Sequence, residues 1–213
     1  MSLIIDWLFP KNCFGCQKGD NYLCNLCENT LKNGHLSNRS GFEGLISVYK
    51  YDGLIKEIIE KIKYEFISDP VKEMAELMNK KLKVNYPNIT RYWQKEKFVL
   101  VPIPLFSQRE KWRGYNQSEL LTKHLARMLN LTVRMILCRN TGGKNQASIR
   151  NRQIRKINIK NVFKVGLKME IPKNIVLVDD VITSGATMCE ARRILSEFGV
   201  QKVWGLSLCG VQK

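Results

Sequence analysis

Continuous apolar runs alternate along the chain with stretches in which apolar residues recur every three or four positions. Continuous runs are typical of strands buried on both faces, and the wider spacing is typical of amphipathic helices. The runs predict strands at residues 45–51, 98–104, 174–180 and 202–209, and a short strand at 133–137. The helical spacing predicts helices at 54–64, 70–82 and 116–130, and one that follows residue 187 and ends at Gly199. Strands that alternate with helices predict an α/β fold with a mainly parallel sheet.

Two segments show no such periodicity. Residues 36–41 (LSNRSG) are small and polar, which predicts a linker. Residues 139–160 are polar and basic and contain two glycines, which predicts a long loop.

Size and composition indicate a soluble globular protein. The chain has 213 residues, of which 44% are hydrophobic and 25% are charged, enough for one domain with a small appendage. The longest apolar runs are too short to cross a bilayer, and the segment MSLIIDWLFPKN lacks the basic start of a secretory signal. We therefore expect a cytoplasmic protein without membrane insertion.

The chain is strongly basic, with 35 Lys and Arg against 19 Asp and Glu and a formal net charge of +16. Such a surplus favours phosphate-rich partners. The excess is concentrated in residues 120–169, which contain twelve basic side chains and no acid. This interval includes the candidate DNA-binding residues Lys144, Arg150, Arg152 and Lys156. The alternative is a solvated surface with no ligand.

Four cysteines lie close together near the start of the chain. Cys13 and Cys16 form one C-x2-C pair, and Cys24 and Cys27 form a second. Two such turns can complete a tetrahedron of thiolates around a structural Zn²⁺. Reduced thiols or two disulfides are the alternatives, and disulfides fit poorly with a chain that lacks an export signal. We expect a zinc-binding element at residues 1–38 and a larger domain at 39–213.

The segment LVDDVITSGAT places two acids at the end of an apolar strand and a hydroxyl-rich turn before a helix. Ligands of parallel sheets bind beyond the carboxyl ends of the strands, where Asp179 and Asp180 lie. The turn, with the free amides and the dipole of the helix start, predicts a site for one phosphate. Its residues are Thr183, Ser184, Gly185, Ala186 and Thr187. Carboxylates beside it suit the hydroxyls of a sugar phosphate. The alternative is an acidic turn in which Thr183 caps the helix.

The segment VLVDDVITSGAT resembles the phosphoribosyl pyrophosphate (PRPP) loop of type I phosphoribosyltransferases. The resemblance implies that Asp179 and Asp180 hold the ribose 2′- and 3′-hydroxyls. It implies also that residues 183–187 bind the 5′-phosphate, and that Mg²⁺ accompanies PRPP.

Other segments resemble the ComF family of competence-associated proteins: the cysteine element with YLC, IKY at 62–64, VPIPL with RGYNQSELL, and RNTGGKNQ. The resemblance implies that the loop after VPIP meets the pyrophosphate and that RNTGGKNQ begins a flexible loop that closes over the site. The candidates on the pyrophosphate side are Arg109, Arg113, Gly114, Tyr115, Asn116 and Gln117. The candidate catalytic residues are Arg139 and Arg155.

Two functions are compatible with these features. In the first, a PRPP-binding competence protein handles single-stranded DNA during DNA uptake, with a helicase or channel protein as a possible partner. Basic side chains among aromatic ones suit unpaired strands; the aromatic candidates are Tyr92, Trp93, Trp112 and Tyr115. In the second, a salvage phosphoribosyltransferase transfers ribose 5-phosphate to a nucleobase. The tail WGLSLCGVQK contains no recognisable base-binding residue, so the acceptor, and with it enzymatic activity, stays open.

Overall fold

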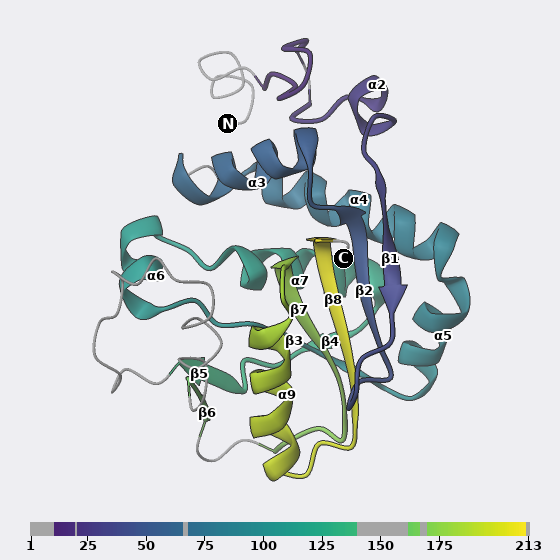
Figure 1. Cartoon of the computed structure of the whole chain (residues 1–213), viewed down its shortest axis with the longest axis vertical. Helices are drawn as coiled ribbons and strands as arrows, with labels where there is room; N and C mark the ends of the chain where they lie inside the picture. Colours follow the sequence, from purple (N-terminus) through teal and green to yellow (C-terminus); the bar gives the residue numbers. More distant parts are fainter. Residues whose placement is uncertain (1–10, 20, 66–67, 140–161, 167–169, 212–213) are drawn as a thin grey trace.

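A computed structural model describes residues 11–19, 21–65, 68–139, 162–166 and 170–211 of the chain (Figure 1). Among these residues, the main sheet has six strands in the order β1-β2-β8-β7-β3-β4. The strands are β1 Asn33–Ser37, β2 Gly44–Lys50, β3 Val99–Pro102, β4 Thr132–Val133, β7 Asn174–Ile182 and β8 Lys202–Gly210. Only β1 is antiparallel to its neighbour; the other pairs are parallel. The α/β fold with a mainly parallel sheet is therefore confirmed.

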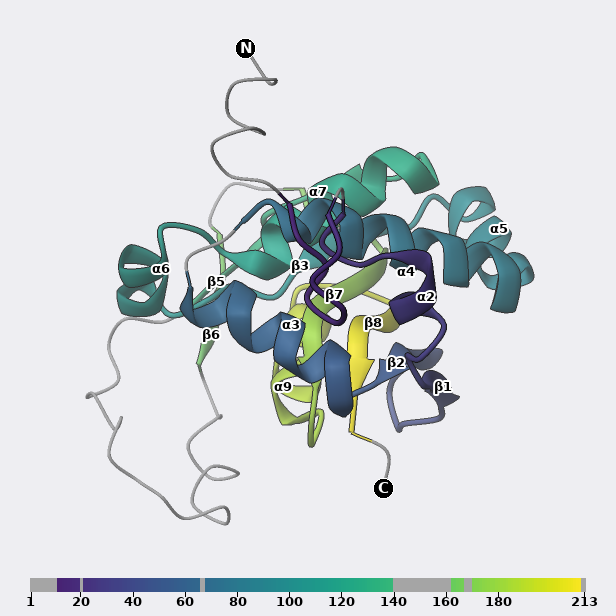
Figure 2. The same ribbon diagram turned by 90° about the horizontal axis from the view of Figure 1, so that it is seen from above.

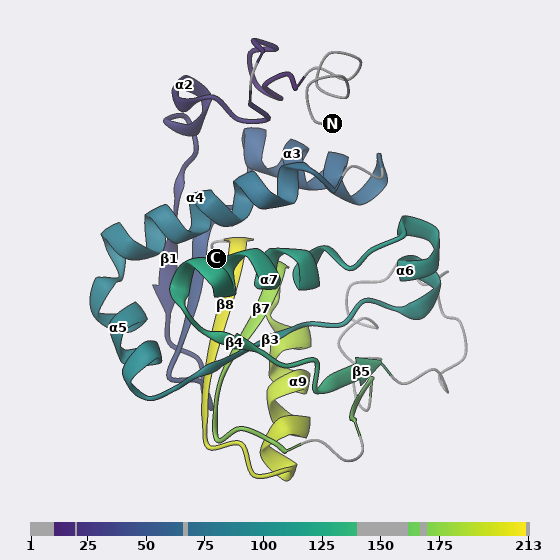
Figure 3. The ribbon, with the colours of Figure 1, turned by 180° about the vertical axis from the view of Figure 1, so that it is seen from behind.

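Helices cover both faces of the sheet, and one helix crosses its end. On one face lie α4 Pro70–Asn85, α5 Pro87–Lys95 and α7 Gln117–Leu129, and on the other lies α9 Ala186–Glu197 (Figure 2). The helix α3 Gly53–Tyr64 passes over the carboxyl ends of β7 and β8, with the short helix α2 Asn25–Glu28 beyond it (Figures 1 and 3). Beside the sheet lie the helix α6 Ser107–Arg113 and a hairpin of β5 Leu137–Arg139 and β6 Phe163–Val165.

The continuous apolar run of β7 follows from its position in the middle of the sheet. Val176 and Val178 belong to the core formed with α3, α4 and α7, whereas Ile175 and Leu177 belong to the core formed with α9. All four side chains are fully buried. Because successive side chains of a strand point to opposite faces, a strand covered on both faces needs apolar residues at every position.

Three described elements differ from the sequence expectations. Residues 36 and 37 belong to the edge strand β1, where a linker was expected; its partly exposed polar residues give no apolar run. The helix α5 was not expected; it is short, and its core-facing side, with Trp93 buried and Ile89 and Tyr92 partly buried, spans little more than one turn. The strand expected at 133–137 is replaced by the separate strands β4 and β5. Most of the expected long loop, residues 140–161, lies outside the described residues.

Within the described parts of the chain, no helix combines the length and the apolar character that a membrane span requires.

Candidate functional site

The acid pair, Asp179 and Asp180, lies near the carboxyl end of β7 and contacts the first turn of α7. The hydroxyl of Ser118 donates a hydrogen bond to Oδ1 of Asp179 over 2.7 Å. The side-chain amide of Gln117 donates to Oδ2 of Asp180 over 3.2 Å. Both carboxylates are therefore oriented before any ligand binds. These hydrogen bonds form because the N-terminus of α7 lies beside the end of β7 in the fold. The sequence motif around the acids does not reveal them.

A lysine from another helix joins the acid pair. The ammonium of Lys63, next to last in α3, lies 2.7 Å from Oδ2 of Asp180. Burial lowers the pKa of Lys63, but the charges of Asp180 and Asp179 outweigh burial and leave the pKa above its ordinary value. Lys63 therefore stays protonated and neutralises part of the negative charge. Lys63 belongs to the segment IKY, which carries a family resemblance but no sign of this ion pair, because the ion pair requires the contact between α3 and β7.

Asp179 has an unusual protonation equilibrium. Burial raises the pKa of this carboxyl most, and the charge of Asp180 raises it further. The Ser118 hydrogen bond and the charge of Lys63 lower it only in part, so the pKa is about 7. In the ligand-free protein, Asp179 thus exchanges its proton near neutral pH. Groups with such shifted pKa values are concentrated at binding and catalytic sites.

The segment after VPIP holds the end of α3 beside the acids. Nε of Arg113 donates to the carbonyl of Lys63 over 2.9 Å, and the hydroxyl of Tyr115 donates to the carbonyl of Ile62 over 2.6 Å. A guanidinium nitrogen of Arg113 also donates to Oε1 of Gln117. Burial lowers the pKa of Arg113 more than the charge of Asp180 raises it. These contacts link the residues around Lys63 to the first turn of α7.

The remaining pyrophosphate-side candidates shape the same turn. Gly114 ends α6 with a φ of 82°, and Asn116 caps α7 by accepting from the amide of Ser118 over 3.0 Å. Asn116 also donates to the carbonyl of Ile103 over 3.1 Å. Arg109 is exposed, with its guanidinium 5.9 Å from the Phe106 ring centre. Contact of these residues with pyrophosphate stays a prediction.

The predicted phosphate loop, residues 183–187, leads from β7 into α9. Gly185 is the N-cap of α9 with a φ of 71°, so the alternative in which Thr183 caps this helix is wrong. Oγ of Ser184 accepts from the amide of Ala186 over 3.4 Å, and Thr183 and Ser184 are exposed. The amides of a first helical turn lack partners within the helix, so this loop presents donors where an anion could bind.

Of the two candidate catalytic arginines, only Arg139 lies in a described segment. Its Nε donates to the carbonyl of Pro104 over 2.8 Å, and its guanidinium stands 3.8 Å from the centre of the Phe106 ring. Burial lowers the pKa of Arg139 to about 10 although the charge of Asp179 raises it. Arg139 thus lies within electrostatic range of the acid pair. Arg155 and the DNA-binding candidates Lys144, Arg150, Arg152 and Lys156 lie outside the described residues.

The four cysteines of the N-terminal element converge on one point. The sulfur atoms of Cys13, Cys16, Cys24 and Cys27 all lie within 4.8 Å of one another, and none is in a disulfide. A Cβ on Gly15 would lie 2.7 Å from the sulfur of Cys27, so only glycine leaves room beside the cluster. This arrangement could bind a zinc ion.

The pKa values of two of these cysteines also fit a bound metal ion. Burial raises the pKa of Cys13, but hydrogen bonds from the backbone of Cys24, Cys16 and Gly15 lower it more, to about 6. Burial and the neighbouring sulfurs raise the pKa of Cys27 to about 12, since a second thiolate beside the first is repelled. A cation between the sulfur atoms would remove the repulsion between thiolates at Cys13 and Cys27.

The cysteine element, residues 13–27, is docked on the larger domain. The carboxylate of Glu73 in α4 accepts hydrogen bonds from the amides of Tyr22 (2.9 Å) and Leu23 (3.2 Å). Lys80, also in α4, forms an ion pair with the buried Glu28 over 2.8 Å. Glu73 and Lys80 were not recognised from the sequence, because a carboxylate or lysine on a helix surface carries no signal of such a contact.

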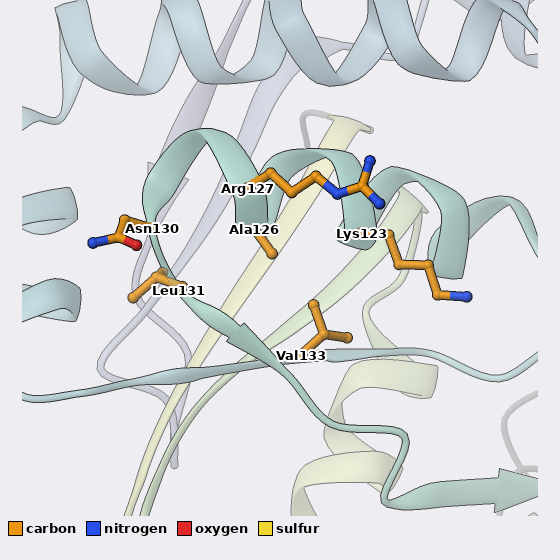
Figure 4. Close-up of a pocket in the computed structure, with 6 residues that line it drawn as sticks. All are labelled: Lys123, Ala126, Arg127, Asn130, Leu131 and Val133. Atoms are coloured by element: carbon orange, nitrogen blue, oxygen red, sulfur yellow. The ribbon is translucent and has the colours of Figure 1, made fainter.

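A basic groove lies along the second half of α7, away from the acid pair and next to the edge strand β4. It is a cavity of about 370 Å³ lined by Lys123, Ala126, Arg127, Asn130, Leu131 and Val133 (Figure 4). The two basic side chains and Asn130 are exposed, and the apolar residues form the wall between them. Lys123 pairs with Glu119 over 2.5 Å. The exposed Arg134 follows β4 directly.

The four aromatic candidates are not equally available for stacking on bases. Trp93 is fully buried, so its expected contact with a nucleic acid is wrong. Tyr115 is occupied by its hydrogen bond to Ile62, and Tyr92 packs on Phe98 at 5.4 Å. Trp112 is 54% exposed and makes an edge contact with the exposed Tyr64 at 6.3 Å. Exposed aromatic surface therefore lies where α3 and α6 meet.

In the described, mainly parallel sheet, strand β7 carries an acid pair near its carboxyl end and continues through residues 183–185 into α9, the arrangement expected of a phosphoribosyltransferase-type fold. The model of the phosphoribosyl transferase domain family matches residues 116–209, which include α7, the acid pair and the phosphate loop. A hypoxanthine phosphoribosyltransferase from Staphylococcus aureus is found among solved structures at 14% identity and a TM-score of 0.37, with 63% of this chain and 62% of that chain covered.

Several curated proteins are similar to this chain. Competence protein F of Haemophilus influenzae is 37% identical over 114 residues, 51% of this chain and 49% of that protein. Competence protein ComFC of Bacillus subtilis is 29% identical over 72% of this chain and 58% of its own length. The DNA utilization protein YhgH of Escherichia coli is 26% identical over 95% of this chain and 90% of its own. The chain is thus similar to proteins named for competence and for DNA utilization, and its match spans only about half of the Haemophilus relative.

Proposed function

We propose that this protein is a phosphoribosyltransferase-like competence protein that binds PRPP with Mg²⁺ and handles single-stranded DNA during DNA uptake. The observation that carries the PRPP assignment is the oriented acid pair at the end of β7, followed within three residues by the phosphate loop. Carboxylates can accept hydrogen bonds from two ribose hydroxyls, and the loop offers backbone donors to one phosphate. A sugar phosphate matches both parts.

The surrounding charges suit a polyanionic ligand. Lys63 compensates the negative charge of Asp180 at 2.7 Å, so that phosphates meet a less repulsive site. The oxygen atoms of Asp179 and Asp180 are hard ligands of the kind that Mg²⁺ prefers. Mg²⁺ bound with PRPP would neutralise charge on its pyrophosphate. We expect Arg139 and Arg109 to face that pyrophosphate, with Arg139 held in place by its hydrogen bond to Pro104.

Two observations favour a role with DNA. The relatives include proteins named for competence and for DNA utilization. In addition, residues 120–139 contain no acid, and the basic groove combines Lys123 and Arg127 with an apolar wall. Basic side chains bind the phosphates of a single strand, and apolar surface accommodates its bases. A DNA-uptake helicase or channel protein would be the partner that delivers the strand.

We propose further that the cysteine cluster binds one structural Zn²⁺. Four sulfur ligands would leave no open position for catalysis. Elemental analysis of the purified protein should give about one zinc per chain. The Cys24→Ser variant should lose it and unfold the cysteine element while the larger domain stays folded. Metal-free protein with an intact element would contradict this assignment.

The alternative function is that of a salvage phosphoribosyltransferase, and one experiment distinguishes it from the DNA-handling role. In one assay, purified protein is incubated with Mg-PRPP and a panel of nucleobases, and pyrophosphate release is measured. In a second assay, DNA binding is measured by the anisotropy of a labelled single-stranded oligonucleotide at several salt concentrations. The proposal predicts DNA binding that weakens with salt, with no base that drives turnover. Rapid pyrophosphate release with one base, and no DNA binding even at low salt, would identify a salvage phosphoribosyltransferase.

A further inference from the structure

Arg39, in the connection between β1 and β2, contacts the phosphate loop from 145 positions away in the sequence. A guanidinium nitrogen of Arg39 donates a hydrogen bond to the backbone carbonyl of Ser184 over 2.7 Å. The same side chain packs on Gly185: a Cβ built on this glycine would lie 2.0 Å from that nitrogen. Gly185 is required by its φ of 71°, and the end of the Arg39 side chain lies where a Cβ would project.

The connection that carries Arg39 is itself fixed on the domain. The carbonyl of Arg39 accepts from the amide of Phe42 over 3.0 Å, which closes the turn, and the amide of Glu43 donates to Val203 of β8 over 2.8 Å. The guanidinium of Arg192 in α9 packs on Gly41: a Cβ there would lie 2.4 Å from its Cζ. Arg39 thus reaches the loop from an anchored backbone.

The hydrogen bond to Ser184 determines how the loop presents its donors. In a planar trans peptide, the carbonyl and the amide of one peptide unit point in opposite directions. An arginine that holds the Ser184 carbonyl on one side therefore fixes the Gly185 amide on the other side. Without Arg39, the Ser184–Gly185 peptide would be free to rotate. Anion binding would then have to order this peptide, which costs conformational entropy.

Charge adds to this effect. Residues 183–187 contain no charged side chain, so the loop depends on neighbouring residues for a formal positive charge. Arg39 provides one directly beside it. A guanidinium has five N–H donors, and one of them suffices for the Ser184 carbonyl. Within the described residues, no acid forms an ion pair with Arg39.

We propose that Arg39 is a positioning residue of the 5′-phosphate site: it holds the Ser184–Gly185 peptide in its binding orientation and contributes positive charge to the phosphate. This inference rests on the proposed PRPP binding and extends that site to the β1–β2 connection. It predicts a defect that depends on the ligand, since only the 5′-phosphate meets this loop. Pyrophosphate, which lacks the ribose 5-phosphate moiety, should not depend on Arg39.

The test is a calorimetric comparison of the full-length zinc-loaded protein with three variants and three ligands. The ligands are Mg-PRPP, ribose 5-phosphate and Mg-pyrophosphate. In Arg39→Ala, affinity for the first two should fall about tenfold, the size expected for one hydrogen bond to a charged group, while pyrophosphate affinity stays the same. Arg39→Lys should recover most of the loss. Arg91→Ala removes one exposed charge on α5 and should match the wild type for every ligand.

The outcomes separate this inference from the function on which it rests. Wild-type protein that binds neither Mg-PRPP nor ribose 5-phosphate would overturn the PRPP assignment itself. Wild-type protein that binds both, together with an Arg39→Ala variant of equal affinity, would overturn only the role of Arg39. An equal loss for pyrophosphate, or a lowered thermal midpoint without rescue by lysine, would also overturn it by indicating a general defect.

Discussion

The acid pair and the basic groove lie at opposite ends of α7, and they are built in different ways. Asp179 and Asp180 are held by Ser118, Gln117 and Lys63, each from a defined direction. In the groove, the long side chains of Lys123 and Arg127 are exposed, and among the described residues an i,i+4 ion pair with Glu119 orients Lys123. The first arrangement suits one small ligand of fixed shape, and the second suits a flexible polyanion.

This difference predicts how each region responds to mutation. Removing a side chain from an oriented site costs the specific hydrogen bonds that it makes to a ligand. Removing a charge from an open groove lowers the affinity for DNA of any sequence by a similar, smaller factor. A higher salt concentration lowers that affinity in the same way.

Replacing both acids should have the largest effect. Asp179→Ala combined with Asp180→Ala removes the acceptors for two ribose hydroxyls, and Mg-PRPP binding should weaken by about 2–4 kcal/mol, or about 30- to 1000-fold. Calorimetry measures the loss, and affinity for single-stranded DNA should not fall. The Arg91→Ala variant serves as the control. Unchanged PRPP affinity in the double variant would contradict the proposed site.

Removing Lys63 should destabilise the site even without a ligand. Lys63→Met leaves the largely buried Asp180 without its cation, which should cost about 2 kcal/mol of unfolding free energy, less than a fully buried pair because Lys63 is partly exposed. Urea denaturation measures it. The matched control is Lys56→Met on the same helix, whose exposed pair with Glu60 at 3.9 Å should contribute little. Equal stability of the two variants would show that the Lys63 pair is not structural.

Asp179 should make stability depend on pH. Its pKa in the folded protein, about 7, exceeds the value of about 4 that is typical of an unfolded chain. The folded state therefore binds this proton more tightly, so its stabilising contribution is complete below about pH 4 and is lost as pH rises toward 7. The difference in unfolding free energy between wild type and Asp179→Asn should change across this window. A constant difference from pH 5 to pH 8 would contradict the raised pKa.

The groove should give the smallest effect of a single change. Each phosphate contact on a single strand contributes about 0.7 to the slope of log affinity against log salt. Arg127→Glu should flatten that slope by about this amount and weaken binding for every sequence tested, while Mg-PRPP affinity stays constant. Anisotropy titrations at several salt concentrations measure it. Binding that keeps its slope would exclude Arg127 from the DNA path.

Strand positions and the acid pair could be predicted because their signals are contiguous. The run at residues 174–180 contains most of the strand β7 and the two acids near its carboxyl end. The edge strand β1 gave no comparable signal, because one of its edges has no partner strand and its side chains are only partly buried. Local patterns thus identify elements that are covered on both faces more readily than elements at the margin.

The partners of the acid pair could not be predicted in the same way. Lys63 and Asp180 are far apart in the sequence, and their contact depends on α3 crossing the end of the sheet (Figure 1). Arg39 and Ser184 are a second such pair. The sequence predicts Tyr115 and Arg113 on the pyrophosphate side, but it gives no sign of their hydrogen bonds to the backbone of Ile62 and Lys63. A motif specifies which residues matter, whereas the fold determines what they touch.

PRPP binding by the wild-type protein can be measured by calorimetric titration of the zinc-loaded protein in the presence of Mg²⁺. The oriented acid pair and the phosphate loop predict saturable binding at one site per chain, competed by ribose 5-phosphate. A folded, zinc-loaded protein that releases or absorbs no binding heat with PRPP at any temperature tested, and that gains no thermal stability from the ligand, would contradict it.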